Sequence, residues 1–199
     1  MGGSSKPPVL LTSTALARGL RELFKQLGER LSLTKPMNVY LAGGLGVYLY
    51  TGTRPSTDVD AEFAGRVLLP SDLVVDVTLE NGERQVLYFD TNYNPMFALL
   101  HEDYQTDSIP VDMGKLPLRV HVLSPVDLAV SKIARFQDHD REDIAGLVRC
   151  GLVTAGEIEK RARDALTGYI GAPGTVTRNI KDAVALARKV EAERDAPRS

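Results

Sequence analysis

The sequence predicts an α+β fold, with a mixed α/β core that follows an N-terminal helix and precedes a helical C-terminal part. Three observations lead to this prediction. Residues 12–32 carry apolar side chains at helical spacing, residues 39–123 contain strand-like runs broken by turn signals, and residues 124–199 return to helical periodicity. We therefore expect a flexible tail over residues 1–11, a mixed α/β core over 12–123 and a helical part over 124–199.

Composition limits the classes of protein to be considered. With 199 residues, 43% of them hydrophobic, the chain is long enough to bury a core within one domain. A net charge of −2 creates no general field that attracts nucleic acid, so such a partner would need a local basic patch. The single cysteine, Cys150, excludes an internal disulfide and is typical of a reducing compartment, so we expect a cytoplasmic protein. No run of 18 apolar residues is present, and no membrane span is expected.

The first helix is predicted over residues 12–32. Its leucines and Phe24 recur every three or four positions, as on one face of a helix. Thr12 or Ser13 is positioned to cap its N-terminus, and Pro36 separates the helix from the first strand-like run.

The next stretch predicts a strand, a glycine turn and a short helix. Val39–Ala42 is a short apolar run that is typical of a buried strand. Gly43 and Gly44 follow, and an apolar segment then runs to Tyr50. Gly52 ends that segment, as glycine commonly ends a helix.

A hairpin is predicted after this helix. Residues 74–80 and 83–90 are strand-like, and the Asn81-Gly82 pair between them is the strongest short hairpin signal, since both turn residues need positive φ. Residues 101–110 are polar and predict no element, whereas residues 118–123 alternate as a strand does.

Helices are predicted from Ser124 onward. Ser124 is a good cap for a helix that runs to about Phe136, because Pro125 is favoured at the first helical position. The further helices are expected over residues 138–150, 155–170 and 179–194, with residues 171–174 as a linker.

The chemistry is concentrated between Gly43 and Asp60. Asp58 and Asp60 stand two positions apart, so on a strand their carboxylates project from the same face and repel each other unless a divalent cation lies between them. Oxygen ligands favour Mg²⁺ or Mn²⁺. Gly43 and Gly44 let the start of a helix approach a phosphate closely. A metal site beside a triphosphate site predicts phosphoryl transfer.

This stretch resembles the signature of the DNA polymerase β-type nucleotidyltransferase superfamily. In that signature a Gly-Gly pair precedes an Asp-x-Asp by about nine to thirteen residues, and here thirteen residues separate Gly44 from Asp58. The resemblance implies a magnesium-dependent transfer of a nucleoside monophosphate from a nucleoside triphosphate (NTP) to an acceptor hydroxyl. It also implies a third metal carboxylate on a neighbouring strand. Asp76, Asp90 and Asp112 all fit this role by local pattern, and we favour Asp90.

A second stretch resembles the distal motif of minimal AbiEii-like and DUF6036-like nucleotidyltransferases. It comprises Leu123–Lys132, then Arg135 and the residues from Asp138 to Ile144. The resemblance implies that Lys132 contacts nucleotide phosphate and that Asp140 or Asp143 completes a distal cluster. Several enzymes of this type are toxins that modify RNA ends or proteins, so a cognate antitoxin is an implied partner.

We therefore take Asp58, Asp60, Lys132 and Asp140 as candidate catalytic residues and Asp58, Asp60 and Asp90 as metal ligands. Gly43, Gly44, Arg54 and Lys132 are the candidate nucleotide contacts.

Several alternatives stay open. Arg54 is either a phosphate contact or a solvated loop charge, and Tyr93-Asn94 is interpreted as a turn in preference to a base pocket. Two other functions fit the same fold. One is a catalytically silent module that binds a nucleotide or a partner, and the other is a nucleotidyltransferase that modifies an antibiotic.

Overall fold

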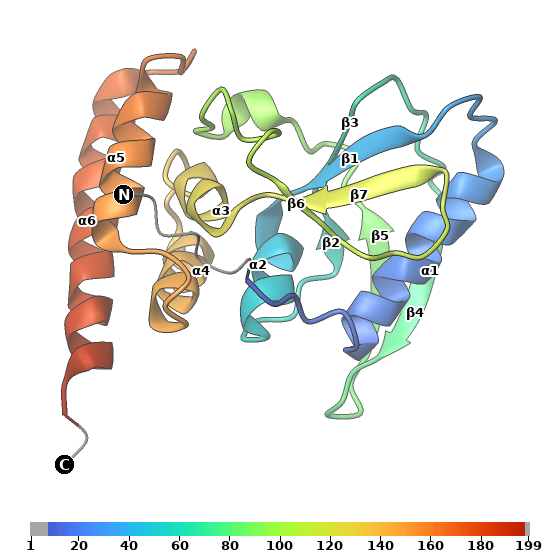
Figure 1. Cartoon of the computed structure of the whole chain (residues 1–199), viewed down its shortest axis with the longest axis horizontal. Helices are drawn as coiled ribbons and strands as arrows, with labels where there is room; N and C mark the ends of the chain where they lie inside the picture. The colour runs from blue at the N-terminus through green and yellow to red at the C-terminus, as the bar shows by residue number, and fades with distance from the viewer. Residues whose placement is uncertain (1–7, 198–199) are drawn as a thin grey trace.

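The structure, a computed structural model, describes residues 8–197 and has the predicted α+β class (Figure 1). The helices are α1 (Ala15–Arg30), α2 (Gly43–Thr51), α3 (Pro125–Ser131), α4 (Asp138–Arg149), α5 (Ala155–Leu166), α6 (Pro173–Asp195) and the 3-10 helix η1 (Pro95–Phe97). The strands are β1 (Met37–Leu41), β2 (Asp58–Val59), β3 (Ala61–Phe63), β4 (Val74–Thr78), β5 (Arg84–Phe89), β6 (Ile109–Pro110) and β7 (Leu118–Val122).

Two mixed sheets form the core and share one extended segment of chain. The first has the order β3-β1-β7-β6 and the second the order β2-β5-β4. In the first, β1 pairs parallel with β7 and antiparallel with β3. In the second, β5 pairs parallel with β2 and antiparallel with β4. Because only Asp60 separates β2 from β3, the chain leaves one sheet and enters the other at this residue.

Helix α1 covers one face of the β4–β5 hairpin (Figure 1). Its fully buried side chains are Leu16, Leu20, Leu23, Phe24 and Leu27. Gly19 permits the close approach, because a β-carbon there would lie 2.8 Å from Leu87 Cδ1. The cap is Thr14, whose hydroxyl accepts a hydrogen bond from the Ala17 N–H, so the expectation of Thr12 or Ser13 was wrong by one or two residues.

The tail expected over residues 1–11 is described only in part. Residues 1–7 lie outside the described residues. Residues 8–11 have no helix or strand, but the Leu11 N–H donates to the Leu49 carbonyl oxygen at 2.8 Å, which ties this end of the chain to α2.

Both glycine signals of the core adopt the predicted positive φ, but Asn81 does not, so the hairpin turn is not the two-residue type predicted for Asn81-Gly82. Gly52 follows α2 with φ 65°, the left-handed conformation that ends a helix. Gly82 has φ 84° in the turn that joins β4 to β5. The strand predicted over residues 118–123 is β7.

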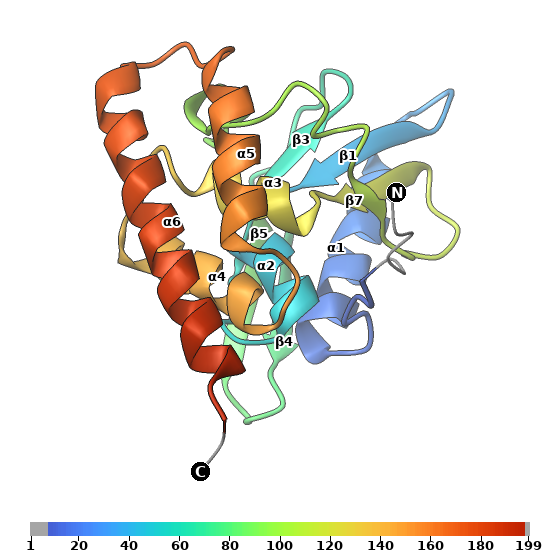
Figure 2. The same ribbon diagram turned by 60° about the vertical axis from the view of Figure 1, so that its left-hand side comes forward.

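The C-terminal helices form a layer beside the sheets. Helices α5 and α6 lie side by side on one flank of the molecule, and α3 and α4 lie between them and the core (Figures 1 and 2). Asp127 ties α3 to α5, because its buried carboxylate accepts hydrogen bonds from Arg161 Nε (2.8 Å) and Nη2 (2.9 Å). No helix within residues 8–197 is long and apolar enough to cross a membrane.

Several predicted boundaries or elements differ in the structure. Helix α5 ends at Leu166 and not at residue 170. Helix α3 ends at Ser131 and not at Phe136, and Phe136 itself adopts φ 49° where the chain reverses before α4. Helix α6 begins at Pro173, so the residues interpreted as a linker start the helix, with proline in the first turn where its missing N–H costs nothing. The stretch predicted to lack structure contains the short strand β6, which pairs with β7.

Candidate functional site

The site is built where the N-terminus of α2 meets the junction of β2 and β3. The Ala42 N–H donates to the Asp60 carbonyl oxygen at 2.9 Å, which places the start of α2 beside Asp60. Gly43 has φ 64°, and a β-carbon there would overlap the Asp60 carboxylate. A β-carbon on Gly44 would lie 2.8 Å from Arg54 Nη2 and 2.9 Å from Ser56 Oγ. The two glycines therefore let side chains of the carboxylate segment lie directly against the helix.

Replacing Gly43 by alanine is expected to disrupt this contact. The added β-carbon would displace the Asp60 carboxylate and strain a left-handed residue, so we expect a loss of roughly 2 to 4 kcal/mol in unfolding free energy. Urea denaturation measures this loss. The matched control is Gly156→Ala in α5, where a β-carbon would meet nothing within 4 Å. An equal effect of the two substitutions would contradict the assigned packing.

Asp60 is partly buried among other charges. Burial and the neighbouring carboxylates of Asp58 and Asp90 raise the pKa of Asp60 to about 6, although Lys132 and Arg135 act in the opposite direction. A carboxylate whose ionised form is this unfavourable gains more than an exposed one from a nearby cation. The surroundings of Asp60 therefore disfavour its negative charge, at the point where this residue lies beside the start of α2.

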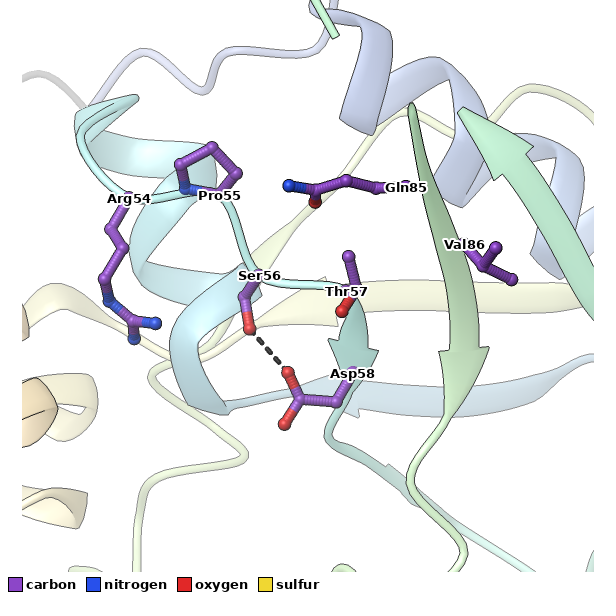
Figure 3. Close-up of a pocket in the computed structure, with 7 residues that line it drawn as sticks. All are labelled: Arg54, Pro55, Ser56, Thr57, Asp58, Gln85 and Val86. Atoms are coloured by element: carbon purple, nitrogen blue, oxygen red, sulfur yellow. Dashed lines mark hydrogen bonds between the residues drawn. The ribbon is translucent and has the colours of Figure 1, made fainter. Parts of the chain in front are cut away.

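Asp58 lies on the same segment but faces a second hollow. Its Oδ1 accepts a hydrogen bond from Ser56 Oγ at 2.6 Å (Figure 3). This hollow has a volume of about 390 Å³, and Arg54 and Gln85 also line it (Figure 3). Asp58 and Asp60 flank the buried Val59, and the charge of Asp58 reaches Asp60, although the two residues line different hollows.

Two buried carboxylates on α4 hold the positive charges of the site in place. Asp143 is 2% exposed and accepts hydrogen bonds from Arg54 Nε (3.2 Å) and Nη2 (3.0 Å). Lys132 Nζ, on a side chain 7% exposed, lies 2.9 Å from Asp143 Oδ2 and 3.9 Å from Asp140 Oδ1. Arg54 therefore forms an ion pair with Asp143. This pairing argues against the alternative that Arg54 is only a solvated charge on a loop.

Asp140 has a structural role as well as a place in the site. It accepts hydrogen bonds from Arg135 Nε (2.9 Å) and Nη2 (2.7 Å) and from the Gln137 backbone N–H (2.9 Å). Burial alone would raise its pKa, but these bonds and the charge of Arg135 lower the pKa of Asp140 below its ordinary value. Through Gln137 it also closes the capping box at the start of α4.

One cavity of about 280 Å³ joins most of the predicted site residues. Residues from three parts of the chain line it. They include Gly43 and Asp60, then Asp90 with the loop that follows β5, and finally Lys132, Arg135 and Asp140 after α3.

Of the three carboxylates considered as a third ligand, only Asp90 lines this cavity. It follows β5, which runs parallel to β2 with Val59 opposite Phe89, so Asp90 stands beside Asp60. Asp76 is exposed on β4. Asp112 is exposed in the loop before β7, where its Oδ1 accepts from the Gly114 N–H.

Sequence reasoning missed part of the cavity wall. Tyr93 ends a turn that its N–H closes on the Asp90 carbonyl oxygen, Asn94 caps η1, and both residues also line the cavity. Phe97 and Ser131 line it too, and no sequence signal singled them out. Ser56 was also missed, although its position two residues before Asp58 could have suggested a hydrogen bond.

The residues present fit a magnesium ion held partly by its substrate. Within residues 8–197, no group of three or more His, Cys, Asp or Glu side chains is arranged to hold a metal ion. Mg²⁺ commonly takes only one or two protein carboxylates and completes its ligands with water and phosphate. Asp58, Asp60 and Asp90 supply oxygen donors of the right kind, and Asp60 carries the charge strain that a cation would relieve.

Comparison with known proteins is consistent with this geometry. Residues 18–177 match the model of a family described as nucleotidyltransferase of unknown function (DUF6036). No curated protein and no solved structure matches the chain. The matched region contains both the glycine–carboxylate stretch and the Lys132–Asp143 cluster.

Proposed function

Because the chain belongs to the DUF6036 family of nucleotidyltransferases of unknown function, we propose that it transfers a nucleoside monophosphate from an NTP to an acceptor hydroxyl. The observation that carries this proposal is a convergence at the N-terminus of α2. The carboxylates of Asp60, between β2 and β3, and of Asp90, after β5, line one cavity with Gly43 at the start of α2 and with the cations Lys132 and Arg135.

The start of α2 suits a triphosphate. No side chain caps this helix, and Gly46 is the first of its residues whose N–H bonds to a backbone carbonyl, that of Ala42. The first-turn N–H groups and the positive end of the helix dipole favour an anion. Lys132 and Arg135 line the same cavity as Gly43 and would add positive charge for the phosphate oxygens.

Asp58 and Asp60 would hold Mg²⁺ or Mn²⁺, with Asp90 as the third carboxylate. A bound ion of this kind supplies charge neutralisation at the phosphates. In the transfer itself, the acceptor oxygen forms a bond to the α-phosphorus, the bond from that phosphorus to the bridging oxygen breaks, and pyrophosphate leaves. The acceptor proton passes to a site carboxylate, for which Asp90 is our candidate.

The decisive experiment is nucleotide labelling. Purified protein with Mg²⁺ and each α-labelled NTP should label an RNA or a protein acceptor, and Asp58→Ala should abolish the labelling. Asp76→Ala is the matched control, since that carboxylate is exposed on β4 and outside the cavity. If the wild-type protein labels no acceptor and binds no NTP, the proposal is wrong.

A second function is favoured by one observation. Asp58 and Asp60 line different hollows, an arrangement that suits a module that binds a nucleotide without turning it over. In the same experiment this alternative predicts NTP binding, measured by calorimetry, with no labelled product for any RNA or protein acceptor. The family resemblance to toxins also makes a cognate antitoxin a candidate partner, and adding an antitoxin should suppress labelling.

A further inference from the structure

Phe97 is an exposed aromatic side chain on the wall of the candidate site. It is 78% exposed, yet it lines the same cavity as Asp60 and Lys132. A phenylalanine normally contributes to stability by being buried, and most of this ring is not. Its exposure beside a site of charged groups indicates a ligand that covers the ring when it binds.

The loop that carries Phe97 is held in place by its own hydrogen bonds. Asp90 Oδ1 accepts from the Asn92 N–H at 2.8 Å, and Asn94 Oδ1 accepts from the Met96 N–H at 3.0 Å. The Phe97 N–H donates to the Asn94 carbonyl oxygen at 3.2 Å. The backbone on both sides of Phe97 is therefore already ordered, and a ligand would lose little free energy in ordering it.

The cavity wall has two chemical parts. One part is charged and comprises Asp60, Asp90, Lys132, Arg135 and Asp140. The other comes from residues 92–98 and combines the Phe97 ring and the half-buried Tyr93 with the side-chain amides of Asn92 and Asn94. A nucleotide has the same division, with anionic phosphates at one end and a flat base with polar edges at the other.

We propose that Phe97 is the platform on which the base of the bound NTP stacks. This inference rests on the proposed function, because it assumes that the triphosphate occupies the charged part of the same cavity. Stacking on an aromatic ring accepts every base, so Phe97 would add affinity without selecting one nucleotide. The amides of Asn92 and Asn94 are the groups within this wall that could bond to a base edge.

The chain has no tryptophan, so Phe97→Trp creates a single fluorescent reporter at the proposed platform. We expect NTP with Mg²⁺ to quench its fluorescence in a saturable way, whereas inorganic tripolyphosphate with Mg²⁺ should bind without quenching. The matched control is Leu68→Trp, at a position that is 90% exposed and outside the cavity, which should not respond to either ligand.

Affinity gives a second readout. Phe97→Ala should weaken NTP binding by roughly 5- to 100-fold and leave tripolyphosphate binding unchanged, since stacking acts on the base alone. Phe97→Leu, which keeps an apolar side chain but removes the ring, should behave like Phe97→Ala. The wild-type stability should be retained in both variants, because the side chain is largely exposed.

The outcomes separate the two proposals. If calorimetry shows that wild-type protein binds NTP, but Phe97→Ala binds it equally well and Phe97→Trp is not quenched, the platform is wrong while the proposed function stands. Quenching by an RNA oligonucleotide in the absence of NTP response would assign the ring to the acceptor and also overturn the platform. If the wild-type protein binds no NTP, both proposals fail.

Discussion

Replacing Asp60 by asparagine is expected to abolish nucleotide transfer and to stabilise the metal-free protein. The amide has the shape of the carboxylate but cannot neutralise a divalent cation. We expect transfer to fall by at least roughly 100-fold, because even hydrogen-bonding partners of metal ligands contribute 10- to 100-fold. The rate of labelling with NTP measures this loss.

The stability change follows from the raised pKa of Asp60, about 6 in the folded protein. Between about pH 4 and pH 6 the folded state binds more protons at this residue than the unfolded state, so stability falls as the pH rises through this window. The full penalty, on the order of 2 to 3 kcal/mol, is present above pH 6. Asp60→Asn removes it, and the variant should melt at a higher temperature than wild type at pH 7 but not at pH 4.

Magnesium gives the matching control for this prediction. Mg²⁺ with NTP should raise the melting temperature of the wild-type protein at pH 7, and this shift should be absent in Asp60→Asn. If Asp60→Asn melts below wild type at pH 7 without metal, burial and repulsion do not disfavour the ionised form of Asp60 as proposed.

Replacing Asp143 by alanine is expected to be the most destabilising change in the site. The substitution would leave Lys132 buried without its nearest partner and would free Arg54, and breaking a buried ion pair typically costs about 3 to 5 kcal/mol. Urea denaturation checks this value. We also expect weaker NTP binding, because both cations lose the carboxylate that orients them.

The control for Asp143 lies on the same helix. Asp138 is 92% exposed and pairs only with Arg141 at 3.4 Å, so Asp138→Ala should change stability by less than about 1 kcal/mol. The double variant Asp143→Leu with Lys132→Met removes both buried charges and should recover much of the lost stability. Equal effects of Asp143→Ala and Asp138→Ala would contradict the role assigned to the buried carboxylate.

The local signals of the fold were the ones that sequence could predict. Gly52 and Gly82 adopt positive φ, the hairpin strands overlap the two strand-like runs, and the first strand overlaps the apolar run Val39–Ala42. Such features depend on neighbouring residues alone. The end of α3 and the start of α6 depend on packing between distant segments. The Asn179 side chain, for example, donates to the Ile133 carbonyl oxygen beyond the end of α3 at 2.9 Å.

The candidate site also has residues that local sequence predicts and residues that only the packing of distant segments reveals. The spacing of the glycines and carboxylates predicted Gly43 and Asp60, and the family resemblance predicted Lys132 and Asp140, all four of which line one cavity, whereas Gly44 and Asp58 do not line it. Asp90 could be named as a candidate, but only the pairing of β2 with β5 separates it from Asp76 and Asp112. Phe97 could not be predicted as part of the site, because it belongs to a short apolar run and no sequence signal indicates that its ring stays exposed.

The hydrogen bond from Ala42 N–H to the Asp60 carbonyl oxygen has a consequence for how such a motif can evolve. It joins the start of α2 to the carboxylate segment through main-chain atoms. A change of side chain therefore leaves it intact, unless residue 42 becomes proline, which has no N–H. The loop over residues 52–57 therefore does not set the distance between the start of α2 and Asp60, because this bond already fixes it. Insertions or deletions there would alter the count of residues between glycines and carboxylates while their separation in space stayed the same.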